Sequence, residues 1–176
     1  MLDRYLGLSD KLRPGFSAAL GRSSEARWHQ ELGLHVPQFP PFLHDIYRRV
    51  LGTRRDSRDQ LMVDFVPGFR LVHLAELVSE TDEARQVYPG AGPFFPFLAN
   101  YSSDYCAWLD GRIVALVHDE PEVLTMHESG AKFFDTICAY YESGAYLLDD
   151  GFLEVDERLE LPIARRLNPG LTFWSD

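Results

Sequence analysis

The clearest hydrophobic pattern in the chain is a pair of apolar runs, residues 105–109 and 113–117, on either side of the dipeptide Asp110-Gly111. Asp-Gly favours a two-residue type I′ turn, so the two runs are predicted to form a β-hairpin. The turn sets the register, with Leu109 opposite Arg112, Trp108 opposite Ile113, Ala107 opposite Val114, Cys106 opposite Ala115 and Tyr105 opposite Leu116. Because alternate pairs point to opposite faces and both faces are apolar, the hairpin is expected at the centre of a sheet covered on both sides.

The other predicted strands flank this hairpin. Residues 94–100 form a strand that leads through a Ser102-Ser103 turn into the hairpin, which gives a three-stranded antiparallel meander. Residues 69–73 are predicted to form a short strand after Pro67-Gly68. Residues 53–64 mix arginines and aspartates without an apolar period and are expected to form an exposed loop. The sheet is expected to end after Val117.

Helical spacing of apolar residues, together with capping and stop residues, predicts helices in the rest of the chain. They are expected at residues 2–20 with a break at Arg13-Pro14-Gly15, from Ser23 or Ser24 to about Leu32, from Pro41 to Gly52, at residues 74–87 with an acidic middle, from Ser129 to a stop before Asp149-Asp150-Gly151, and in an acidic tail that Pro162 interrupts. The expected fold class is α+β: a mainly antiparallel sheet built around a central β-meander, with α-helices packed around it.

Composition predicts a single domain spanning residues 1–176, because 45% of the residues are apolar and no linker-like stretch divides the chain. No apolar run approaches the roughly 20 residues that span a bilayer, and charges stand where a signal peptide needs its apolar region. A cytoplasmic location without membrane contact is therefore expected. Cys106 and Cys138 fall within a predicted strand and a predicted helix, which favours small buried hydrophobes over a disulfide, a redox pair or a metal site.

The net charge of −10 at pH 7 disfavours nucleic acid as a partner and suits a basic protein. Acidic residues gather at two places that the predicted fold leaves exposed: the loop after the last meander strand and the tail. They are the candidate partner-binding residues: Asp119, Glu120 and Glu122 in the loop, and Glu154, Asp156, Glu157 and Glu160 in the tail.

Motifs with defined chemistry are missing from the sequence. It contains no Gly-rich phosphate loop, no HExxH or paired CxxC, and no nucleophile elbow, so no catalytic, metal-binding or cofactor-binding residues are predicted. The alternative is a small hydrolase or metal-dependent enzyme that uses His118 and Asp119 at a strand end with His127 and Glu128 at the start of the next helix. A solvated loop between a strand and a helix is itself rich in such residues.

Several strings resemble the SUKH superfamily. WHQELGLHVPQFPPFLHDIYRRVLG (28–52) is similar to its opening helix, its Leu-x-Val/Leu-Pro step and a helix that ends at a glycine, and GFRLVHLAEL (68–77) to its short strand before a helix. PFFPFLANYSSDYCAWLDGRIVALVHDEPE (93–122) resembles its central meander, and SGAKFF from Ser129 its next helix start. The resemblance covers about residues 28–145 and leaves out an N-terminal helical extension, 1–22, and a C-terminal acidic helical extension, 149–176.

The resemblance implies an α+β domain that binds other proteins and has no catalytic residues. The superfamily includes yeast cell-wall-assembly regulators and many bacterial immunity proteins that bind and neutralise a cognate toxin. An immunity protein is the leading hypothesis, because an acidic surface suits a basic toxin. A regulatory or scaffolding protein-interaction domain is the alternative, and the sequence is compatible with both a monomer and a homodimer.

Overall fold

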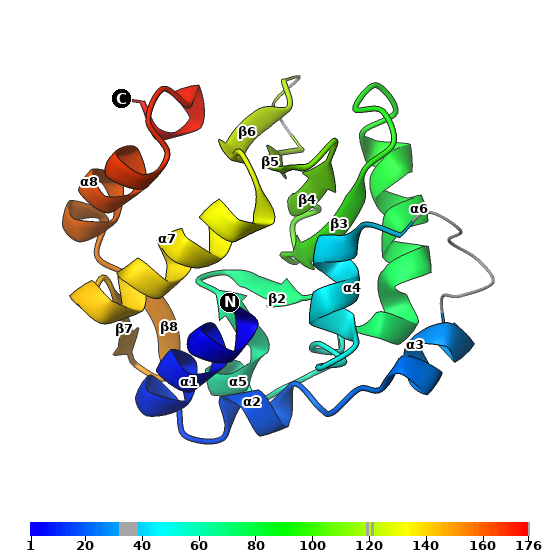
Figure 1. Ribbon diagram of the computed structural model, residues 1–176, viewed down its shortest axis with the longest axis horizontal. Helices are drawn as coiled ribbons and strands as arrows, with labels where there is room; N and C mark the ends of the chain where they lie inside the picture. Colours follow the sequence, from blue (N-terminus) through cyan, green and yellow to red (C-terminus); the bar gives the residue numbers. More distant parts are fainter. Residues whose placement is uncertain (32–38, 119, 121, 176) are drawn as a thin grey trace.

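A six-stranded antiparallel sheet forms the centre of the protein (Figure 1). The computed structural model describes residues 1–31, 39–118, 120 and 122–175. The strands pair in the order of the sequence, and their bounds are Asp64–Val66 (β1), Phe69–Leu71 (β2), Phe95–Ala99 (β3), Tyr105–Leu109 (β4), Arg112–Leu116 (β5) and Leu124–His127 (β6). A separate sheet contains only Tyr146–Asp149 (β7) and Phe152–Val155 (β8). The predicted α+β class, with a mainly antiparallel sheet, is confirmed.

Helices pack around this sheet and occupy most of the positions that the sequence predicts. Their bounds are Leu2–Leu12 (α1), Phe16–Ala19 (α2), Glu25–Glu31 (α3), Pro41–Tyr47 (α4), Gln60–Val63 (α5), Leu77–Val87 (α6), Gly130–Ser143 (α7) and Glu157–Leu167 (α8), with short 3₁₀ turns at Leu74–Glu76 (η1) and Thr172–Trp174 (η2). In Figure 1, α6 lies beside β3, while α7 runs from β6 towards β7 and contacts α1 and α8. The predicted end of the α3 helix at Leu32 lies outside the described residues.

The central hairpin has the predicted register at all five positions, from Leu109 opposite Arg112 to Tyr105 opposite Leu116. Asp110 and Gly111 have φ angles of 48° and 87°, the positive values that a type I′ turn requires. Both faces of the hairpin are covered: the residues of β4 and β5 are buried except Trp108 and Leu109, which are half-buried, and Arg112. The prediction of a central, doubly covered hairpin is therefore confirmed.

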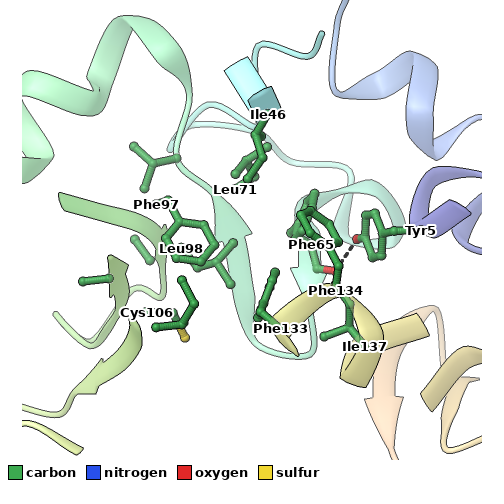
Figure 2. Close-up of a cluster of buried hydrophobic side chains, with 14 of the residues drawn as sticks. Tyr5, Ile46, Phe65, Leu71, Phe97, Leu98, Cys106, Phe133, Phe134 and Ile137 are labelled. Atoms are coloured by element: carbon green, nitrogen blue, oxygen red, sulfur yellow. Dashed lines mark hydrogen bonds between the residues drawn. The ribbon is translucent and has the colours of Figure 1, made fainter. Parts of the chain in front are cut away.

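The core joins the sheet to α7 and to the N-terminal helices (Figure 2). Phe97 and Cys106 extend from the sheet, Phe133 of α7 packs against Phe97, and Phe134 of α7 lies beside Tyr5. Tyr5 of α1 is fully buried, stacks near Phe65 and donates a hydrogen bond to its backbone oxygen. The helical extension at residues 1–22 is thus part of the same core as the segment that carries the resemblance.

The sequence analysis is wrong about residues 53–64, which are not an exposed loop throughout. Thr53 is buried, and its amide donates to Leu71 O at 2.8 Å, so this residue runs alongside β2. The helix α5 and strand β1 follow, and β1 pairs with β2 across the Pro67-Gly68 turn. The buried Arg13 guanidinium donates to the backbone oxygens of Leu61 and Asp64. Such long-range hydrogen bonds leave no periodic pattern in the sequence.

The sheet does not end after Val117. Residues 124–127 form β6, which pairs with β5, so His127 belongs to a strand and not to the start of α7. The strand has four residues, three of them half-buried, and therefore lacks the continuous apolar run that marks β4 and β5.

Three helix boundaries also differ from the prediction. The helix that begins at Pro41 ends at Tyr47 rather than at Gly52, because the chain beyond it turns to pair Val50 with Arg22. The helix that begins after Ser129 ends at Ser143, and Gly144 caps it with a φ of 75°, so Leu148 lies in β7. Pro162 lies within α8 without interrupting it. A proline removes only one backbone hydrogen bond, and the helix continues on both sides.

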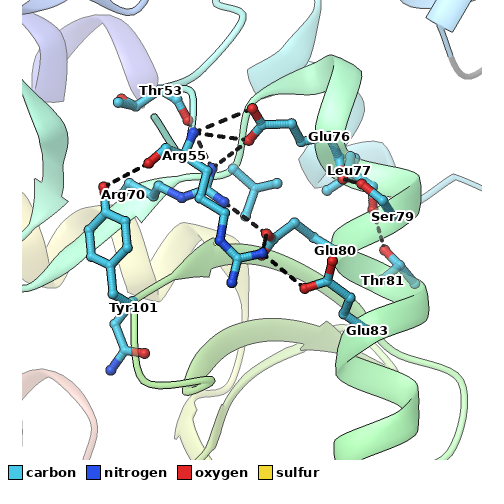
Figure 3. Close-up of polar contacts among 12 residues, drawn as sticks. Thr53, Arg55, Arg70, Glu76, Leu77, Ser79, Glu80, Thr81, Glu83 and Tyr101 are labelled. Atoms are coloured by element: carbon cyan, nitrogen blue, oxygen red, sulfur yellow. Dashed lines mark hydrogen bonds and ion pairs between the residues drawn. The ribbon is translucent and has the colours of Figure 1, made fainter. Parts of the chain in front are cut away.

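A buried ion pair joins β2 to the acidic middle of α6 (Figure 3). Arg70 and Glu80 are only 2% and 4% exposed, and Nη2 of Arg70 donates to Oε1 of Glu80 at 2.9 Å. Nη1 of Arg70 donates to Thr53 O and to Glu76 Oε2, each also at 2.9 Å. Burial raises the pKa of Glu80, although Arg70 and then Arg55 act to lower it. The acidic run in α6 is therefore partly a structural network and not only a solvated face.

Candidate partner-binding surfaces

The first predicted surface is the loop between β5 and β6. Glu120 and Glu122 are exposed, and Asp119 lies outside the described residues. The two glutamates line a cavity of about 420 Å³ together with His118 and Tyr88, which stands at the end of α6. This part of the predicted surface is accessible, and the cavity beside it has both charged and apolar lining residues, among them Val87 and Val123.

His118 links the start of this loop to Asp104, in the connection between β3 and β4. Its backbone amide donates to Oδ1 of Asp104 at 2.9 Å, and its Nδ1 lies 3.1 Å from the same oxygen. Burial acts to raise the pKa of Asp104, but hydrogen bonds from His118 and Asn100 outweigh it and keep the pKa below its ordinary value. His118 and Asp104 therefore position the loop.

The structure does not bring His118 and His127 together. His118 is exposed beyond the last residue of β5, whereas His127 lies opposite Ile113 near the first. His127 is buried against Phe133 and Trp174, with Nδ1 2.9 Å from Oδ1 of Asn168. Glu128 is exposed. Within the described ranges, no three His, Cys, Asp or Glu side chains are grouped so as to hold a metal ion.

Because His127 is buried, the free energy of unfolding is predicted to depend on pH. Burial lowers its pKa from 6.5 to about 4, and the hydrogen bond with Asn168 offsets only part of that shift. Between these values the unfolded chain binds a proton that the folded protein does not, so the stabilisation is complete above pH 6.5 and is lost as the pH falls to about 4. A shift of this size corresponds to roughly 3 kcal/mol.

Urea unfolding at a series of pH values measures this contribution. We expect the unfolding free energy of the wild type to fall more steeply over that pH window than that of His127→Gln. The control is His29→Gln, because the side chain of His29 is 61% exposed. Equal pH dependences in the wild type and His127→Gln would contradict the neutral, buried state of His127.

The second predicted surface, at the C-terminal end of the chain, is formed by the β7–β8 hairpin and α8. The sequence analysis places Glu154, Asp156, Glu157 and Glu160 in one acidic tail, but the structure gives them different environments. Glu154 is exposed on β8, and Glu157 is exposed at the first residue of α8. In Figure 1 this hairpin is far from the end of β5, so the two predicted acidic sets belong to separate surfaces.

Asp156 has a structural role at the start of α8. Its Oδ1 accepts a hydrogen bond from the amide of Arg158 at 3.0 Å, which caps the helix. The Arg158 guanidinium also contacts both carboxylate oxygens, at 2.9 and 2.7 Å, and these hydrogen bonds lower the pKa of Asp156. The negative charge of Asp156 is therefore already paired within the protein.

Glu160 is half-buried, contrary to the expectation that all the acidic tail residues are exposed. Burial raises its pKa, and the neighbouring Glu157 adds to the effect. Glu160 lies in the first turn of α8, which packs against α7, and its side chain lines the edge of an apolar cavity.

The outward face of the β7–β8 hairpin presents apolar side chains that the sequence analysis missed. Leu147 lies opposite Glu154 and Phe152 lies opposite Asp149, so these four residues share one face. Leu147 is 36% and Phe152 43% exposed, whereas Tyr146 and Leu153 on the inner side are buried. The signal that could have found this hairpin is Asp150-Gly151, whose φ angles of 46° and 84° match those of the turn at Asp110-Gly111.

Comparisons with known proteins add no assignment to these surfaces. A scan against protein-family models returns no match for the chain, and a search among curated proteins returns none either. Among the helices that the structure describes, none has both the length and the apolar character needed to cross a bilayer.

Proposed function

We propose that this chain is a non-enzymatic protein-binding domain that acts in the cytoplasm as an immunity protein, by binding and neutralising a basic toxin. The observation that carries the proposal is the outward face of the β7–β8 hairpin, where exposed Leu147 and Phe152 stand between the carboxylates of Asp149 and Glu154. Membership of the SUKH superfamily is part of the same proposal. It is supported by the antiparallel meander followed by a serine-capped helix.

The face combines the two features that specific protein interfaces use. Apolar and aromatic side chains at the centre of an interface supply most of the binding energy once water is excluded. Leu147 and Phe152 are diagonal neighbours across the two strands, roughly 7–8 Å apart, so one partner side chain can contact both. Both remain exposed in the isolated chain, although burying them would remove apolar area from water.

The charges around these side chains favour a basic partner. Asp149 and Glu154 lie on the same face as the two apolar residues, Asp150 lies in the turn beside Phe152, and Glu157 begins α8 shortly after β8. The chain as a whole carries a net charge of −10. Complementary charge accelerates association and excludes acidic partners, and its effect decreases as salt is added. Toxins that act on nucleic acid are typically basic, which makes them suitable partners for such a surface.

The proposal predicts that a reading frame next to the gene for this chain encodes a toxin domain, and the experiment uses that domain. Co-expression of that domain with the wild-type chain is expected to restore growth of the host cell, and an inactivated toxin domain is expected to bind the purified chain. Growth arrest despite co-expression, or no binding to the inactivated domain, would contradict the proposal. Binding without protection would support the regulatory or scaffolding alternative instead.

Charge reversal on the hairpin tests where the toxin binds. Glu154→Lys combined with Glu157→Lys is expected to slow association by about tenfold at low salt, with little change in melting temperature, because both side chains are exposed. The difference from wild type is expected to shrink as salt screens the charges. Asp156 is not suited to this test, since loss of its cap costs about 1 kcal/mol of stability.

The matched control is Glu120→Lys combined with Glu122→Lys, on the loop after β5. It changes the net charge by the same amount on the other predicted surface, so it separates local contact from the total charge of the chain. Stopped-flow or surface-based kinetics with the inactivated toxin domain measure both variants. If only the loop variant slows association, the partner binds the loop and not the hairpin.

A further inference from the structure

A second cavity, of about 280 Å³, lies between the sheet, α7 and the C-terminal segments. One wall is formed where β1 ends and β2 begins, at Val66 and Phe69. Residues of β7, β8 and α8 form a second wall, and η2 lies on a third side. Aromatic rings make up much of its lining: Phe69, Phe133, Tyr140, Tyr146, Phe173 and Trp174. An apolar cavity of about 150 Å³ holds benzene, so this one has room for an aromatic ring with a short chain attached.

Among the described residues that line this cavity, Glu160 is the one with an acidic side chain. The other titratable groups of the lining are neutral: burial lowers the pKa of His127 to about 4, raises the pKa of Cys106 to about 12, and raises the pKa values of Tyr140 and Tyr146. The Glu160 carboxylate forms no ion pair or side-chain hydrogen bond with any residue in the part of the chain that the structure describes.

Two further observations favour binding of a cation at this site. The Tyr140 hydroxyl is buried and has no hydrogen-bond partner among the described residues, and the nearby Glu160 carboxylate contributes to the raised pKa of Tyr140. The charge that interacts most closely with Glu160 is that of Glu157, which is also negative. A half-buried carboxylate beside another carboxylate is costly unless a positive charge accompanies it.

We propose that this cavity binds a small organic ammonium ion with an apolar aryl or alkyl body. The faces of aromatic rings attract a cation through their quadrupole, and they also bury the apolar body of the ligand. The Glu160 carboxylate pairs with the ammonium group at the edge of the cavity, where the head group can keep part of its hydration. The inference goes beyond the proposed function and does not depend on it, since it concerns a different surface and a different class of ligand.

Three ligands of similar shape test the charge preference: phenethylammonium, phenethyl alcohol and hydrocinnamate. Each is titrated into the purified chain, and amide and side-chain shifts are followed by NMR. Phenethylammonium is expected to bind about tenfold more tightly than the alcohol, and the anionic hydrocinnamate to bind most weakly. The shifts are expected to centre on Trp174, Tyr140 and Phe173.

Two variants separate the role of Glu160 from the total charge of the protein. Glu160→Gln is expected to weaken binding of phenethylammonium about tenfold and to leave the alcohol unchanged. The control is Asp135→Asn, which removes the same charge at an exposed position on α7 outside the cavity and is expected to leave both affinities unchanged. Melting curves of both variants establish that they are folded.

Three results would overturn the proposal: no binding of the ammonium ion in the millimolar range, equal affinities for the ammonium ion and the alcohol, or an unchanged ammonium affinity in Glu160→Gln. The measurements use the purified chain alone, so they are independent of any toxin.

Discussion

Val114→Asp is expected to prevent folding. Val114 is 2% exposed in β5, and its partners on the neighbouring strands, Ala107 of β4 and Thr125 of β6, carry no positive charge that could pair with a carboxylate. A carboxylate buried there without a partner costs several kcal/mol even if it takes up a proton. The total stability of a domain is only about 5–15 kcal/mol. The same result is expected for Leu116→Asp, whose side chain is 1% exposed.

Soluble expression and thermal melting followed by circular dichroism measure the effect. The matched control is Arg112→Asp, which places the same carboxylate at an exposed position of the same strand. We expect this control to melt cooperatively within a few degrees of the wild type. A soluble Val114→Asp variant with a cooperative transition near that of the control would show that the centre of the sheet tolerates a charge.

The central hairpin could be predicted in detail because its determinants are local. The turn residues Asp110 and Gly111 take the two positive φ angles, and this two-residue turn then sets every pair in the ladder between the flanking apolar runs. The cap at Ser129 is also local, since its Oγ accepts from the amide of Lys132, three residues further along. Features of this kind depend on neighbours in the sequence, so the sequence shows them.

The elements that the sequence analysis missed depend on contacts between distant residues. Strands β1 and β6 have only three and four residues, too few to show alternation, and they are stabilised by the neighbouring strands of the sheet. The β7–β8 hairpin was hidden because Ala145 and Leu148 continue the helical spacing of α7 past its true end at Gly144. The same Asp-Gly turn that identified the first hairpin was present there at residues 150–151.

The candidate sites were less predictable than the fold. Charge alone led to Glu154 and Glu157, which are exposed, but also to Asp156, whose carboxylate caps a helix, and to Glu160, which lines a cavity. Leu147 and Phe152 were missed because the face on which they lie exists only once the second hairpin is formed. The surface function of a residue thus depends on which face it occupies, and a wrong element boundary changes that face.

The buried pair of Arg70 and Glu80 gives the second large effect. Arg70→Met is expected to destabilise the protein by about 3–5 kcal/mol, because it leaves the Glu80 carboxylate buried with only the longer contact to Arg55, at 3.4 Å. It also removes the hydrogen bond to Thr53 O, which holds the segment before α5 against β2. Glu80→Leu is expected to cost less than Arg70→Met, because Arg70 keeps its ion pair with Glu76 and its hydrogen bond to Thr53 O, each at 2.9 Å.

The double variant Arg70→Met/Glu80→Leu separates the loss of the pair from the cost of an unpaired charge. Replacing both members with apolar side chains removes the buried charges together, so we expect it to recover most of the stability that each single change loses. The control is Arg55→Met: the Arg55 side chain is 52% exposed, its shorter contact is with the exposed Glu83, and Glu80 keeps its ion pair with Arg70, so the loss is expected to stay below about 1 kcal/mol. Chemical denaturation of the four proteins and the wild type gives the coupling energy, and simple additivity of the two single losses would show that Arg70 and Glu80 do not stabilise the fold as a pair.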